Sequence, residues 1–235
     1  MGAKLKVLGI AAKWLFILCL PILLVTASLG WAVNSLWLYK YGFQKYGVSQ
    51  TTGLAEVELD KTATGLITYF NSDEEHITIT VVKGNEPFEL FNEREVIHLR
   101  DVKGLIRLDY WVLLGTLVYA LGYAGFCLIW RKRRYWCHLA WGVVSGGGIT
   151  LALMLALGLG TMVSFDQLFL QFHLLGFSNE LWQLDPSKDY LIMLFPQGFF
   201  YDAAMFCALA TAGLAIILGG VAGSYLLFTR SKATP

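Results

Sequence analysis

The chain alternates between long apolar stretches and segments that carry most of its charged side chains. Four stretches are long enough to cross a hydrocarbon core of about 30 Å as helices, at about 1.5 Å per residue. The first could also be a signal peptide, because Val25-Thr26-Ala27 offers a small-residue cleavage site. Its apolar stretch continues past Ala27, which favours an uncleaved helix. We expect transmembrane helices at residues 8–33, 108–130, 138–163 and 203–228.

Residues 34–107 form the one sizeable polar region. Residues 76–82 alternate apolar and polar positions and are rich in β-branched side chains, which predicts a strand. Lys83-Gly84-Asn85 ends this strand in a turn, whereas residues 56–71 fit either a short helix or a strand. We therefore expect a small mixed α/β domain, too short for a core of its own, that packs against the membrane helices.

The end of this region predicts the start of another helix. Asn92 with Glu95 three residues later is typical of a capping box. From this start Glu95, His98 and Asp101 follow at intervals of three and share one helical face. A carboxylate one turn from an imidazole suits a general base, although a solvated face of a juxtamembrane helix gives the same pattern.

Residues 164–202 are apolar and aromatic, yet they contain His173 and several carboxylates. Ionisable groups near bilayer depth are costly, so they indicate a functional site. A single hydrogen-bonded packing histidine is the alternative. Asp185-Pro186 is expected to begin a turn, and Pro196 to break a short interfacial helix.

Composition supports a membrane protein. Of the 235 residues 56% are hydrophobic and 15% are charged, against about 25% charged in soluble domains. The net charge of +1 and the absence of a basic aromatic patch give no indication of nucleic-acid binding. We expect an all-α integral membrane protein with four transmembrane helices and an extracytoplasmic mixed α/β domain between the first two.

Cations fix the expected orientation. Lysines precede the first stretch, residues 131–137 open with Arg131-Lys132-Arg133-Arg134, and Arg230 follows the fourth stretch. These positions share one side of four spans, which the positive-inside rule assigns to the cytoplasm. The N- and C-termini are therefore predicted to be cytoplasmic, and residues 34–107 and 164–202 to face outward.

This orientation predicts that two histidines meet. His98 precedes the second span and His173 follows the third, so both are expected near the outer interface. His76 lies farther out on the predicted strand and is expected to be structural. His138 follows the cytoplasmic cations and belongs on the opposite side.

Nucleophilic catalysis by the chain itself is not indicated. All four cysteines, Cys19, Cys127, Cys137 and Cys207, lie in or beside apolar stretches, where a thiol behaves as a small apolar residue. No Gly-x-Ser-x-Gly motif is present. We expect chemistry without a covalent enzyme intermediate, a cofactor or a metal.

Two other functions stay open at this point. A metal-dependent membrane hydrolase would use Glu95, His98, His173 and one of Asp185, Asp189 or Asp202, but no dense ligand motif is present. A non-enzymatic membrane adaptor is the second alternative. The last three spans lack ionisable residues at their centres, which disfavours an ion or solute path.

Three motifs in order resemble the Lit family, the lipoprotein intramolecular transacylases of Gram-positive bacteria. They are LITYF, FELFNEREVIHLRDVKGL and FDQLFLQFHLLGFSNELWQLDPSKDYLIMLFPQGFF. The resemblance covers the whole architecture. It implies transfer of the sn-2 acyl chain of a diacylglyceryl-cysteine lipoprotein to the α-amino group of the same cysteine, at the outer face of the cell membrane, to give the lyso-form lipoprotein.

By motif position the resemblance implies that His98 and His173 are catalytic, one as base and the other as acid or oxyanion partner. We expect Asp101 to orient His98, and Glu95 to support the site. Lys103, Arg100 or Arg94 is expected to stabilise the oxyanion. Trp182, Asn179, Asp185 and Phe172 are weaker candidates for substrate-lining residues.

Overall fold

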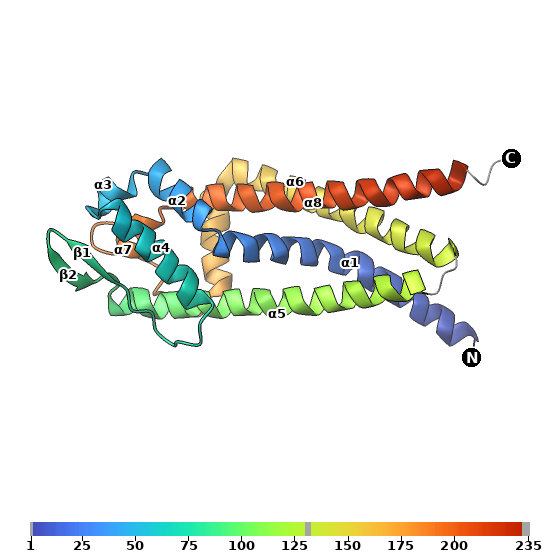
Figure 1. Cartoon of the computed structure of the whole chain (residues 1–235), viewed down its shortest axis with the longest axis horizontal. Helices are drawn as coiled ribbons and strands as arrows, with labels where there is room; N and C mark the ends of the chain where they lie inside the picture. Colours follow the sequence, from blue (N-terminus) through green and yellow to red (C-terminus); the bar gives the residue numbers. More distant parts are fainter. Residues whose placement is uncertain (1, 130–132, 232–235) are drawn as a thin grey trace. The chain divides into compact units, whose positions relative to one another are not determined.

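The computed structural model describes residues 2–129 and 133–231, and Figure 1 follows these from α1 to α8. Within the described ranges, four helices are long and apolar enough to cross a membrane. These helices are α1 (Gly2–Asn34), α5 (Glu93–Ile129), α6 (Arg133–Gly176) and α8 (Gln197–Ser231). The chain is thus a mainly helical, multi-pass membrane protein, as the hydropathy pattern predicts.

All four helices continue past the stretches that predict a membrane span, α1 from Gly2 to Asn34 instead of 8–33. α5 begins fifteen residues before the predicted span, because its first turns belong to the capped segment that starts after Asn92. α6 runs to Gly176 across a kink at Ser164, whose extended backbone (φ −159°, ψ 73°) separates two helical parts. α8 begins directly after Pro196. The extensions of α5 and α6 carry His98 and His173.

Part of the predicted basic loop lies outside the described residues. Arg131 and Lys132 fall in the gap, and α6 begins at Arg133. Lys232, like the side chains of Lys4 and Lys6, also falls outside the described part of the chain.

Between α1 and α5 lie short helices and one hairpin. The helices are α2 (Leu36–Lys45), α3 (Val48–Thr52) and α4 (Glu56–Phe70), which resolves the helix-or-strand alternative for residues 56–71 as a helix. A further short helix, α7 (Tyr190–Leu194), precedes Pro196. This region therefore combines helices with a two-stranded sheet.

The predicted strand at residues 76–82 is wrong at its beginning. β1 (Thr80–Lys83) pairs antiparallel with β2 (Glu86–Glu89) across a turn in which Gly84 and Asn85 both have positive φ, 59° and 75°. Positive φ at both central residues is the requirement of a tight hairpin turn. His76 is exposed and precedes the strand. The alternation before Thr80 instead reflects burial of Ile77 and Ile79 in an irregular extended segment.

Contacts divide the chain into two units, and the first consists of the membrane helices. It comprises the described residues of 1–29, 109–159 and 207–235. Leu20, Leu24 and Ala215 form a buried cluster in it. Two polar contacts add specificity between helices: the Tyr119 hydroxyl donates to the Ala12 carbonyl at 2.8 Å, and Thr211 donates to the Ser28 hydroxyl at 2.9 Å.

The outer surfaces of this unit are apolar. Trp111, Ile129, Leu155 and Val221 are each more than 60% exposed. Apolar patches of this extent are rare on soluble monomers, because water penalises them. Helices that satisfy their own backbone hydrogen bonds and present apolar side chains outward fit a hydrocarbon environment.

The glycines of α6 allow close helix packing at particular positions. A Cβ at Gly146 would lie 2.9 Å from Leu20 Cδ2 and 3.0 Å from the Ile17 carbonyl oxygen, whereas a Cβ at Gly148 would meet nothing within 4 Å. Gly142 likewise faces Phe16. Gly142 and Gly146 therefore serve close helix packing, whereas Gly148 does not.

A substitution tests this distinction. We expect Gly146→Val to destabilise the protein by about 1–3 kcal/mol, because backbone atoms of α1 cannot move aside for the new side chain. Gly148→Val, on the same helix, serves as the control. Thermal unfolding in detergent micelles measures both, and equal losses for the two variants would contradict this packing account.

The second unit contains all the candidate site residues that the sequence indicates. It comprises residues 30–108 and 160–206. Within it α2 contacts α3 and α4, α3 contacts α7, and β1 contacts α4. Tyr39, Phe195 and Phe199 form an aromatic cluster among α2 and the start of α8. The early turns of α5 and the last turns of α6 belong to this same unit.

Candidate active site

His98 and His173 come together, as their positions in the sequence predict. Their ring centroids are 6.3 Å apart and the ring planes differ by 26°. Both side chains are buried, with 7% and 8% exposure. His98 lies in the second turn of α5 and His173 in the last turn of α6. Two sequence-distant imidazoles thus face one another in an apolar environment.

Aromatic side chains enclose this pair. Phe177 contacts both imidazoles, at centroid distances of 4.9 Å to His98 and 5.5 Å to His173. Phe169 packs against His173 at 4.4 Å and Trp182 at 4.9 Å. Phe172, a predicted lining residue, contacts His173 at 5.4 Å and is largely exposed. The enclosure lowers the local dielectric, which strengthens electrostatic interactions inside it.

Phe169 and Phe177 are not among the site residues that the sequence indicates. Phe169 and His173 lie four residues apart on one face of the end of α6, and Phe177, directly after the helix, continues this spacing. This spacing is visible in the sequence and could have indicated that the two phenylalanines lie beside His173. In an apolar stretch with many phenylalanines, however, it does not stand out from packing.

Hydrogen bonding fixes the state of the His173 ring. Its Nδ1 lies 2.8 Å from the Phe169 carbonyl oxygen. A carbonyl only accepts, so Nδ1 carries a proton, and in the neutral ring Nε2 has the free lone pair. The Nε2 atom of His173 is therefore the position at which this ring can accept a proton.

His98 differs in that its Nδ1 is buried without a hydrogen-bond partner. Leaving a buried polar atom unsatisfied costs about 1–3 kcal/mol. Native proteins retain few such atoms, and those at functional sites have an explanation in ligand or catalytic chemistry. An unpaired lone pair costs less than an unpaired N–H. The neutral ring of His98 therefore favours the proton on Nε2.

The predicted capping box is present and positions His98. The Glu95 carboxylate accepts from the Asn92 amide at 2.8 Å, and the Asn92 side chain accepts from the Glu95 amide at 3.1 Å. The second oxygen of Glu95 accepts from the Leu191 amide at 2.6 Å. Glu95 therefore joins the start of α5 to α7, one turn before His98.

Asp101 makes a different contact from the expected one. Its carboxylate accepts from the Asn179 side-chain amide at 2.8 Å. In the part of the chain that the structure describes, it makes no hydrogen bond to His98, whose Nδ1 is unpaired. Asn179 in turn accepts from the Leu181 amide at 3.0 Å. The Asp101–Asn179 pair links α5 to the loop that carries Trp182.

The basic residues predicted as oxyanion groups hold loops instead. Arg94 donates to the carbonyls of Glu180 and Leu181 at 2.8 and 3.4 Å. Arg100 pairs with Glu75 at 3.5 Å. Each contact joins α5 to a segment distant in sequence, and among the described residues neither guanidinium has a hydrogen bond or ion pair to a histidine.

Lys103 is similarly engaged. Its ammonium donates to the Glu74 carbonyl at 2.6 Å and lies 4.0 Å from the Tyr69 ring centroid. Burial raises the pKa of the Tyr69 phenol, so its hydroxyl keeps its proton and donates to the Glu75 carbonyl at 2.9 Å. Lys103 and Tyr69 together fix the segment after α4.

The aspartates of the metal alternative are engaged by groups other than the histidines. Asp189 accepts from Asn92 at 2.9 Å, and Asp202 accepts from Lys45 and Tyr46 at 2.6 and 2.8 Å.

Hydrogen bonds from Ser187 hold the pKa of Asp185 below its usual range, and they close the predicted turn. Among the described residues, no three His, Cys, Asp or Glu side chains gather as metal ligands.

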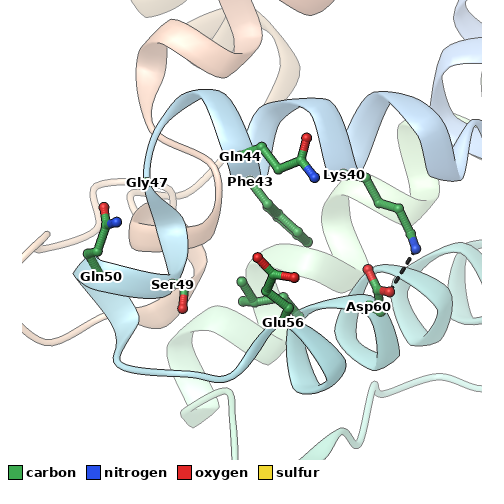
Figure 2. A pocket seen from close by; sticks show the side chains of 9 residues that line it. Lys40, Phe43, Gln44, Gly47, Ser49, Gln50, Glu56 and Asp60 are labelled. Carbon is green, nitrogen blue, oxygen red and sulfur yellow. Dashed lines mark hydrogen bonds and ion pairs between the residues drawn. The ribbon is translucent and has the colours of Figure 1, made fainter.

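The described part of this unit contains cavities, two of which bear on the site. One, of about 290 Å³, lies among α2, α3 and α4 (Figure 2), with the Lys40–Asp60 ion pair (2.7 Å) in its wall and no histidine in its lining. The other, of about 340 Å³, is an open groove between α5 and the end of α6. Phe177, which touches both imidazoles, lines this second groove, so it adjoins the histidine pair.

Comparisons with known proteins agree with this architecture. The family model of the lipoprotein intramolecular transacylase Lit matches residues 14–200. The fold is similar to that of the membrane integral lipoprotein intramolecular transacylase Lit of Bacillus cereus, with a TM-score of 0.74 over 100% of both chains at 21% identity. A histidine-to-alanine variant of that protein gives 0.76 at 21% identity, over 97% of this chain and 99% of the other.

A sequence relative matches a smaller part of the chain. An uncharacterized protein of Aquifex aeolicus is 27% identical over 139 residues, which are 58% of this chain and 59% of that protein. The chain thus matches less than two thirds of the length of this relative.

Proposed function

The chain belongs to the lipoprotein intramolecular transacylase Lit family, and on that premise we propose the reaction that it catalyses. It moves the sn-2 acyl chain of a diacylglyceryl-cysteine lipoprotein to the α-amino group of the same cysteine. The product is the lyso-form lipoprotein, which has one N-acyl and one O-acyl chain. The observation that supports this best is the buried histidine pair, in which one imidazole has an unpaired nitrogen.

The reaction balances without an added reactant. The amine nitrogen forms a bond to the ester carbonyl carbon, and the carbon–oxygen bond to the glyceryl group breaks. The amine loses one proton and the glyceryl oxygen gains one. The chain therefore needs to supply a proton acceptor, a proton donor and a fixed geometry.

His173 is the proton acceptor in this proposal. With Nδ1–H bound to the Phe169 carbonyl, its Nε2 takes the proton of the attacking amine. An α-amino group has a pKa near about 8, and imidazole is well matched to it as a base. The protonated ring then returns the proton to the leaving glyceryl oxygen.

His98 is the donor to the developing oxyanion. The neighbouring cations that the sequence suggested for this role are engaged with loop carbonyls and carboxylates. A proton on Nε2 of His98 supplies a preoriented donor inside the aromatic enclosure, where such a donor is most effective.

The aromatic wall suits a lipid substrate. Phe172 is largely exposed beside His173, and Leu175 of the same helix is 86% exposed. In the proposed orientation the termini are cytoplasmic and the histidines lie at the outer interface, so acyl chains reach the pair from the bilayer. The lipoprotein is the partner, and membrane lipid surrounds the site.

Mass spectrometry of a lipoprotein tests this function. The protein is expressed in a host whose lipoproteins have two glyceryl-linked chains and a free amine, and the N-terminal peptide is fragmented. We expect one acyl chain on nitrogen at unchanged total mass, also when a chelator is present. Peptides that keep both glyceryl chains, with the protein shown to be expressed, would refute the proposal.

A further inference from the structure

We infer that the groove between α5 and the end of α6 is the subsite for the α-ammonium group of the substrate's N-terminal cysteine, and that Asp101 is the anion that binds it. The inference rests on the proposed function, since it concerns the same substrate. It assigns Asp101 a role in substrate specificity instead of the orientation of His98.

The lining of the groove supports this assignment. Arg100, Asp101, Gly104, Phe177 and Ser178 contribute to it, and its volume of about 340 Å³ is that of a small ligand site. A Cβ at Gly104 would meet nothing within 4 Å, so the floor is open there. The Asp101 side chain is 25% exposed. Its carboxylate is therefore partly desolvated yet accessible to a ligand.

The position of the groove fits the reacting amine. Asp101 lies one turn after His98 on α5, and Phe177 lines the groove while it touches both imidazoles. An ammonium group held by Asp101 is thus next to the histidine pair. The substrate amine is mostly protonated near neutral pH, because its pKa is near about 8.

The surroundings of Asp101 moderate its attraction. A bare carboxylate would hold the ammonium form so firmly that the amine could not lose its proton. Asn179 already donates to one oxygen at 2.8 Å, and the Arg100 guanidinium lies 4.0 Å from the other. These contacts leave Asp101 able to attract the amine and then release it to the base. Arg100 is placed to donate hydrogen bonds to peptide carbonyls in the same groove.

The test uses two unreactive diether lipopeptides, one with a free α-amine and one N-acetylated, and the full-length protein in detergent micelles. Ether linkages prevent acyl transfer, so binding is measured apart from catalysis. We expect the wild type to bind the free amine about tenfold more tightly than the N-acetyl form, the size typical of a charge-assisted hydrogen bond. Asp101→Asn should abolish this preference by weakening only the free-amine complex.

Further variants separate charge recognition from general damage. Asp73→Asn removes a carboxylate from an exposed ion pair with Arg107 and should retain the preference. Gly104→Phe fills the groove without altering the carboxylate and should lose the preference. With an ester substrate, Asp101→Asn should raise KM about tenfold and change kcat little, a split that a merely structural role would not give.

Two results overturn the inference: a wild type that binds both diethers equally, or an Asp101→Asn variant that keeps the wild-type preference. The first needs no variant and so does not depend on folding. Neither result affects the proposed function, which fails only if the wild type transfers no acyl chain from the ester substrate.

Discussion

Alanine at either His98 or His173 is expected to lower the rate of acyl transfer by about 10²–10⁴-fold, the range that general acid–base groups contribute. In the proposed reaction His173 transfers the proton and His98 donates to the oxyanion, and the two rings lie with their centroids 6.3 Å apart. The double variant should be about as slow as each single variant, because residues that act as a unit lose their effects non-additively. Purified protein and an ester lipopeptide, followed by mass spectrometry, measure these rates.

His76→Ala is the matched control, because His76 is exposed on the segment before β1. It should keep the wild-type rate. Thermal unfolding shows whether the slow variants are folded. Folded His98→Ala and His173→Ala variants that both retain full activity would contradict the role given to the pair.

Glu95→Ala is expected to cause the largest loss of stability among single substitutions near the site. Glu95 is 1% exposed, and its carboxylate accepts from the amides of Asn92 and Leu191. Hydrogen bonds to charged groups contribute about 1.5–3 kcal/mol each, and alanine leaves both amides unsatisfied. We expect a destabilisation of about 3 kcal/mol or more, measured by thermal unfolding in detergent micelles.

Glu93→Ala is the control for this prediction, since Glu93 is an exposed carboxylate in the same first turn of α5. Its loss should change stability by no more than about 0.5 kcal/mol. Glu95→Gln keeps one acceptor oxygen and should fall between the two. A Glu95→Ala variant as stable as Glu93→Ala would show that the link between α5 and α7 is not important for the fold.

Local signals in the sequence predicted the parts of the site that depend on short-range geometry. The capping box of Asn92 and Glu95 follows from a three-residue spacing, and the structure confirms it. The approach of His98 to His173 follows from topology, because two segments on the same side of adjacent spans are confined to one layer. The membrane topology alone is therefore enough to predict that these two distant residues approach one another.

Long-range partners could not be predicted in this way. Arg94 and Lys103 look like free cations beside a catalytic helix, yet each is bound to carbonyls in a distant segment. Nothing in the sequence of α5 shows that residues 74 and 180 approach it. The same applies to Asp101, whose partner Asn179 lies 78 positions away. Charge and spacing identify a reactive face, but they do not show which groups on it are already engaged.

The strand predicted at residues 76–82 begins only at Thr80, again because long-range partners are not visible in the sequence. Ile77 and Ile79 alternate with polar residues as strand residues do, and both are buried. A strand also needs a partner, and β2 ends at Glu89, opposite Thr80. The alternation of apolar and polar residues therefore begins before Thr80, whereas the strand pairing begins only at Thr80.

The most direct test of the central claim is an isotope crossover experiment on the purified protein. Two diacylglyceryl lipopeptides of different peptide sequence are mixed, and only one has a deuterated sn-2 chain. We expect the deuterated chain to move to the amine of its own peptide, with no deuterium on the other peptide and no free fatty acid. Deuterium on the second peptide, or release of deuterated fatty acid, would contradict intramolecular transfer by the histidine pair.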